Sequence, residues 1–107
     1  YESRCRVTGV DELSHLRASH IKPWSMSDDV EKLSGSNGLL LAPHIDHLFD
    51  KGYITFADEG QLIVSDQLAP SVLAAWGMRA GVDCGEFNSD QKRFLAFHRN
   101  HIFRKSM

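Results

Sequence analysis

An apolar run that leads directly into a proline-initiated helix constrains this chain more than any other feature of its sequence. Gly38–Leu41 is short, apolar and bounded by turn residues, which is typical of a buried strand. Pro43 follows it, and proline favours the first turn of a helix because an N–H has no partner there. Ile45, Leu48 and Phe49 then recur at helical spacing, so they predict an apolar helix face that packs on the strand.

A second strand is expected before this unit. Leu16–Ile21 ends close to Pro23, and the residue before a proline is biased toward extended geometry, so this segment favours strand over helix. Ser25–Ser36 is polar and has room for at most one helical turn, around 30–33. We interpret it as a loop between the two halves of a site.

The remainder of the chain predicts a hairpin and two helices. Tyr53–Phe56 and Leu62–Val64 flank a turn that contains glycine, which is typical of a β-hairpin. Ser71–Ala80 predicts a short helix, and Asn88 or Ser89 is suited to cap a final one. We expect these helices to cover the hairpin and enlarge the core. The final helix carries a mostly apolar stripe of Phe94, Leu95, Phe97, His98, Ile102 and Phe103.

Four polar residues around the strand and helix form a chemical set: His20, Asn37, Asp46 and Asp50. On the helix, Asp46 and Asp50 stand four residues apart, with carboxylates about one turn apart that can hold one ion. An imidazole titrates near neutral pH, so His20 can act as a base if tertiary structure brings it to the carboxylates. Two simpler interpretations stay open: a buried His20 bonded to a backbone carbonyl, and a plain turn at Asn37-Gly38.

Three motifs, ASHIKPW, NGLLL and HIDHLFDKG, stand in this order between Ala18 and Gly52. Together they resemble the HNH nuclease family, in the branch found in bacterial restriction-type proteins. The resemblance begins at Arg4–Gly9 and continues to Tyr53–Phe56, so it covers about the first half of the chain. It implies a core of the ββα-metal type.

The expected fold is therefore α+β, with a ββα-metal (HNH) core followed by a β-hairpin and C-terminal helices. A chain of 107 residues with 42% hydrophobic residues supports one modest core. We expect a single nuclease domain over 1–107, with its core at about 1–65 and a helical cover at about 66–107. The first motif follows Tyr1 almost at once, which suggests a domain taken from a longer protein.

The resemblance also implies roles for the polar residues. It implies that His20 is the general base and that Asn37 accepts a hydrogen bond from the imidazole, which fixes the ring nitrogen that is free to act. Asp46 and Asp50 are the first candidates for ligands of one divalent metal ion, and His44 is the next. The helix departs from its relatives, where the position of Asp46 often holds histidine and that of His44 an acidic residue.

The ligand types indicate which metal to expect. Carboxylates with water in the remaining positions favour Mg²⁺ or Mn²⁺, whereas an imidazole among the ligands admits Ni²⁺ or Zn²⁺. Ser19 stands where many relatives have a ligand, so a backbone carbonyl or a water would complete the shell. Cys5 and Cys84 are far apart and form no C-x-x-C pair, so we expect no structural zinc.

Arg17, Lys22 and His47 are the candidates for contacts with a nucleic-acid backbone. For Arg17 and Lys22, a simple solvated charge is an equal interpretation. The net charge of −2 and the pI near 6.3 count against nucleic-acid binding, although acidic metal ligands themselves lower the charge. The histidines outside the motifs are assigned to structural or surface positions: His15, His98 and His101.

The function implied is metal-dependent endonucleolytic cleavage of DNA, with one metal ion and a histidine base, by the cutting module of a restriction-type protein. Two alternatives stay open: a catalytically silent HNH-like module that only binds nucleic acid, and a purely structural set of histidines. One such site cuts one strand, so we expect a homodimer in the full-length protein, with a specificity domain elsewhere in it. No signal peptide or membrane span is visible, and two free thiols suit the cytoplasm.

Overall fold

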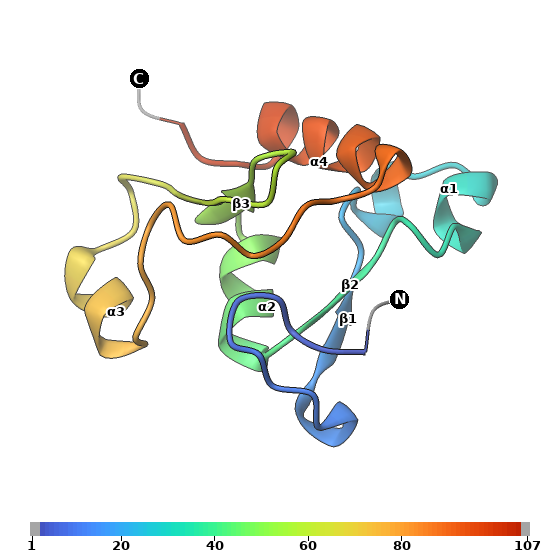
Figure 1. The fold of residues 1–107 in the computed structure, drawn as a ribbon. Coiled ribbons are helices and arrows are strands. Elements are labelled where there is room, and N and C mark those ends of the chain that lie inside the picture. Colours follow the sequence, from blue (N-terminus) through green and yellow to red (C-terminus); the bar gives the residue numbers. More distant parts are fainter. Residues whose placement is uncertain (1–2, 106–107) are drawn as a thin grey trace.

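The computed structural model describes residues 3–105 and shows two short antiparallel sheets surrounded by helices (Figure 1). A single-turn 3₁₀ helix precedes the first strand and another follows it. No helix within 3–105 is both long and apolar enough to cross a membrane. In chain order the elements are η1 (Leu13–His15), β1 (Arg17–Ser19), η2 (Trp24–Met26), α1 (Asp29–Leu33), β2 (Leu39–Leu41), α2 (Pro43–Asp50), β3 (Ile54–Phe56), β4 (Leu62–Val64), α3 (Pro70–Ala75) and α4 (Ser89–His101).

The first sheet and the helix after it form one packed unit. β1 and β2 are antiparallel, with Arg17 opposite Leu41 and Ser19 opposite Leu39. α2 begins at Pro43, as the sequence predicts, and packs against both strands. The predicted apolar face of the helix is buried in the core: Ile45, Leu48 and Phe49.

The second sheet is the predicted hairpin, and α4 covers it. β3 and β4 are antiparallel, with Ile54 opposite Val64 and Phe56 opposite Leu62. All three residues of β3 are buried because α4 packs on this strand, across the top of the molecule in Figure 1. Of the two candidate caps for the last helix, Asn88 is the one used, since its side chain accepts a hydrogen bond from the backbone N–H of Gln91.

α3 is shorter than the sequence predicts. The helix was expected over Ser71–Ala80, and it ends at Ala75. Gly77 has a φ of 66°, in the left-handed region that favours glycine and commonly ends helices. The prediction extended the helix through this glycine, which is where the error arose.

His98 is a structural histidine at the centre of the C-terminal half. The side chain is only 1% exposed, and its ring stacks on that of Phe49 with centroids 3.9 Å apart. Its Nε2 donates to the backbone carbonyl of Phe49 at 2.9 Å, which leaves Nδ1 to accept from the hydroxyl of Thr55 at 2.8 Å. Burial lowers the pKa of His98 to about 4, so the ring is neutral at pH 7. The structural role assigned from the sequence is confirmed for His98, whereas His15 and His101 are exposed.

Candidate active site

An open groove of about 540 Å³ lies between the end of β1 and helix α2. One wall consists of 18–20 and 23–25, and the other contains Asp46 and Asp50. Tertiary structure therefore brings His20 to the two carboxylates, as the sequence predicts. Asp46 is half-buried and Asp50 is exposed, which leaves both carboxylates accessible from the groove.

His20 directly follows the last residue of β1 and lines the groove. It is half-buried, whereas its neighbours Ser19 and Ile21 are buried. The ring meets the indole of Trp24 edge-on, with centroids 5.3 Å apart and planes at 75°. Within residues 3–105 the imidazole donates no hydrogen bond to a backbone carbonyl. The simpler interpretation of His20 as a buried, bonded histidine is therefore wrong.

Asn37 is fully buried and holds the backbone of the loop that follows His20. Its Oδ1 accepts from the N–H of Lys22 at 2.8 Å, and its Nδ2 donates to the carbonyl of Glu31 at 3.2 Å. Nδ2 also lies 3.4 Å from the carbonyl of Lys22 and from the hydroxyl of Ser27. The prediction of a hydrogen bond between this amide and the imidazole of His20 is therefore wrong, because the amide bonds the loop instead. These bonds also make Asn37 more than a plain turn residue.

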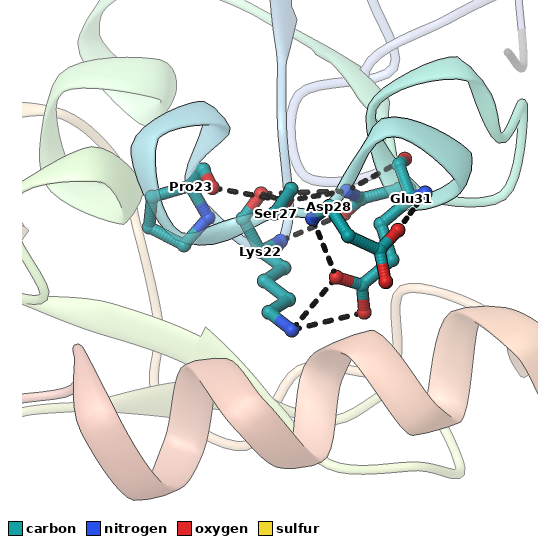
Figure 2. A network of polar contacts seen from close by, with 6 residues as sticks. Lys22, Pro23, Ser27, Asp28 and Glu31 are labelled. Atoms are coloured by element: carbon teal, nitrogen blue, oxygen red, sulfur yellow. Dashed lines mark hydrogen bonds and ion pairs between the residues drawn. The ribbon is translucent and has the colours of Figure 1, made fainter.

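The ammonium of Lys22 forms an ion pair within the protein. Its ammonium bonds both carboxylate oxygens of Glu31 at 2.9 Å (Figure 2). The same ammonium lies 4.8 Å from the ring centroid of Phe97. The backbone N–H of Asp28, together with this ammonium, holds the pKa of Glu31 below its ordinary value. The phosphate contact expected of Lys22 does not fit this geometry, because the ammonium is paired with Glu31. Arg17 is exposed on β1, so it remains a candidate for a phosphate contact.

The comparisons agree with this arrangement. Residues 5–57 match a family model described as HNH endonuclease, and this segment contains β1, β2, α2 and every residue of the groove.

This segment belongs to the HNH endonuclease family.

The fold of the HNH domain extends beyond the family match. A solved structure described as a modification dependent TagI restriction endonuclease is similar over 94% of this chain, with 24% sequence identity and a TM-score of 0.53. The likeness thus includes the hairpin and the C-terminal helices. The chain spans about a third of that protein, since 33% of its length is covered. No curated protein matches the chain.

The HNH groove offers two carboxylates for a metal ion. Within 3–105, no group of three or more histidine, cysteine, aspartate and glutamate side chains is arranged to hold one. Asp46 and Asp50 suit a hard cation that keeps several waters, because Mg²⁺ is commonly held by one or two carboxylates. His44 is half-buried, and its ring packs edge-on against Trp76 at 5.3 Å, outside the lining of the groove. His47 is exposed on the same helix.

Two residues near His20 were not singled out from the sequence. The tryptophan of the ASHIKPW motif, Trp24, contacts the imidazole of His20, and the sequence did not predict this contact. Glu31, which pairs with Lys22, lies in the polar loop. A signal for its local role was available, because an Asp followed three residues later by a Glu predicts a capping box, and Asp28 and Glu31 form one at the start of α1. The pairing with Lys22 had no comparable signal.

Proposed function

We propose that this HNH domain is an endonuclease that hydrolyses phosphodiester bonds in DNA, with His20 as the general base and one divalent metal ion held by Asp46 and Asp50. The observation that carries the proposal is the groove that all three side chains line. Mg²⁺ or Mn²⁺ is the first choice, because both ligands are carboxylates.

Hydrolysis of a phosphodiester requires a positioned water, an acceptor for its proton and positive charge near the phosphate. His20 is the only imidazole of the groove lining, and both walls leave it accessible to a water and a phosphate. Asn37 holds the loop after His20, which keeps the imidazole on its wall. His20 takes the proton of the attacking water as the new P–O bond forms and the bond from phosphorus to the 3′ oxygen breaks, and the leaving 3′ oxygen takes a proton from solvent water. The products are a 5′-phosphate and a 3′-hydroxyl.

The carboxylates of Asp46 and Asp50 lie on the opposite wall of the groove from His20. Asp46 and Asp50 hold the metal ion from one face of α2, which fixes them one helical turn apart. When bound, the ion supplies positive charge that stabilises the pentacovalent transition state and the leaving oxygen. Arg17, exposed on β1, is the proposed contact to the phosphate backbone, together with His47 on α2.

We further propose that the domain is the cutting module of a restriction-type protein. The solved structure that it resembles is a restriction endonuclease, of which this chain covers one third. Specific protein–DNA interfaces bury roughly 1,000–2,500 Å² of protein surface, so choice of the target sequence belongs to another domain. Because one site faces one phosphate, cleavage of both strands requires two copies, most simply a homodimer.

Plasmid cleavage by matched variants tests the proposal. His20→Ala should abolish Mg²⁺- and Mn²⁺-supported nicking of supercoiled plasmid, while retaining DNA binding and the melting temperature. His15→Ala is the control, because His15 is exposed and outside the groove. Full activity of His20→Ala, or no cleavage by the unaltered chain with either ion, would overturn the proposal.

The second candidate is a silent domain that binds DNA without cutting it. It is favoured by the absence of a three-ligand metal group within 3–105. In that case the unaltered chain would shift DNA in a gel, would leave the plasmid uncut, and would show no heat of binding on titration with Mn²⁺.

A further inference from the structure

We propose that Trp24 is a positioning residue for His20, which holds the imidazole in the orientation from which it accepts a proton. The inference rests on the proposed function of the groove. It goes beyond that function, because it assigns the alignment of the base to an aromatic contact rather than to a hydrogen bond.

The imidazole of His20 must be held in one orientation to act as a base. A catalytic histidine is usually fixed by a hydrogen bond from its second ring nitrogen to a carbonyl or a carboxylate. Within residues 3–105, His20 has no such bond, and Asn37, the expected partner, binds the backbone of Lys22. The described contact that remains is the ring of Trp24, at 5.3 Å between centroids and 75° between planes. This spacing and tilt lie in the preferred range for edge-to-face rings, so the contact resists rotation of the imidazole.

Trp24 is itself held in place. Pro23 restricts the backbone before it, and the hydroxyl of Ser27 donates to the carbonyl of Pro23 at 2.9 Å. The ammonium of Lys32 lies 4.8 Å from the centre of the indole, in cation–π range. The indole therefore presents a fixed surface to the imidazole.

Burial does not explain this tryptophan. Its side chain is 55% exposed and lines the groove, so most of it contributes nothing to the core. A role at the groove accounts for a large aromatic side chain at this exposed position.

The chain contains a matched control. Trp76 is 42% exposed and meets His44 edge-on at 5.3 Å and 70°, nearly the geometry of the first pair. Neither ring of this second pair lines the groove. Removal of Trp76 therefore repeats the loss of an exposed tryptophan–histidine contact without touching the proposed base.

The test compares Trp24→Leu, Trp24→Phe and Trp76→Leu with the unaltered chain. Single-turnover nicking of plasmid is measured against pH with protein in excess, and DNA affinity is measured without metal. We expect Trp24→Leu to lower the plateau rate about tenfold or more, with DNA affinity within about twofold. Trp24→Phe, which keeps an aromatic edge, should recover most of the rate, and Trp76→Leu should match the unaltered chain.

NMR gives a readout that does not depend on cleavage. The carbon-bound ring protons of His20 should change chemical shift in Trp24→Leu, because the ring current of the indole is lost, while those of the buried His98 stay in place and report an intact fold. Trp24→Gln repeats the test with a side chain suited to an exposed site. A wild-type rate in folded Trp24→Leu or folded Trp24→Gln, with His20→Ala inactive, overturns the inference and leaves the proposed function standing. An active His20→Ala overturns the proposed function and the inference together.

Discussion

Acid should destabilise this domain through His98, which is held neutral in the core. The ring stacks on Phe49, donates to the carbonyl of that residue and accepts from Thr55, so a second proton on the ring would remove the acceptor that Thr55 uses. Burial lowers the pKa of His98 to about 4, whereas an unfolded chain holds it at about 6.5. The unfolded state therefore binds a proton first as the pH falls.

The difference between the two pKa values of His98 gives the direction and size of the effect on the free energy of unfolding. The stability contributed by the neutral ring is fully present above about pH 6.5, and it is lost progressively as the pH falls toward about 4. The whole difference corresponds to about 3 kcal/mol, most of which is lost by about pH 4.5. Small domains have about 5–15 kcal/mol of stability in total, so this loss is a large share.

Urea unfolding between pH 7.5 and 4.5 measures the effect, with His98→Gln as the variant that cannot titrate. We expect the variant to be less stable at pH 7.5, because glutamine does not reproduce the ring stacking, but to lose about 2 kcal/mol less on acidification. Carboxylates titrate lower and remain in both proteins, so the difference between the two isolates His98. His101→Gln, an exposed histidine of the same helix, should follow the unaltered chain. Equal acid dependence of His98→Gln and the unaltered chain would refute the argument.

Three further results are expected. Asp46→Asn and Asp50→Asn should each weaken Mn²⁺ binding in calorimetry, and unchanged affinity in both would place the ion elsewhere, with His44 the next candidate. Asn37→Ala should cost about 2–4 kcal/mol in urea unfolding, because it leaves buried backbone groups of the loop without partners; a loss below about 1 kcal/mol would show that water replaces the amide. On supercoiled plasmid the domain should mainly nick, and linear product should rise more steeply than first order in protein; first-order linear product from a monomeric preparation would contradict the need for two copies.

The local structure was largely predictable, because its causes are local. Pro43 and the spacing of three apolar residues identified α2, its first residue and its buried face. The hairpin followed from two apolar runs around a glycine-containing turn, and Asn88 was one of two named caps. α3 was the exception, because a single glycine at a positive φ ended it and the sequence pattern alone did not show which conformation Gly77 takes.

The site was predictable in its composition but not in its contacts. His20, Asp46 and Asp50 were named from motif and spacing, and they line one groove. The hydrogen-bond partners of Asn37 and Lys22 could not be predicted in this way, because many donors and acceptors are available and only the folded loop brings particular ones near. Lys22 beside a histidine motif suggests a phosphate contact until Glu31, nine residues later, is found against its ammonium. The contact of Trp24 with His20 is likewise visible only once η2 has formed.

Helix α4 lies outside the segment that matches the HNH family, yet it contacts the supports of both groove walls. The ring centroid of its Phe97 lies 4.8 Å from the ammonium of Lys22. The backbone N–H of Lys22, two residues after His20, donates to Asn37. One residue later, the ring of His98 accepts a hydrogen bond from the hydroxyl of Thr55 in β3 and donates one to the carbonyl of Phe49 in α2. Helix α2 contains both aspartates of the groove. Adjacent residues of one helix thus contact the loop that follows His20 and the helix that contains Asp46 and Asp50. The spacing between His20 and the carboxylates therefore depends on α4 as well as on the HNH core, because a shift of this helix would move the two walls relative to each other.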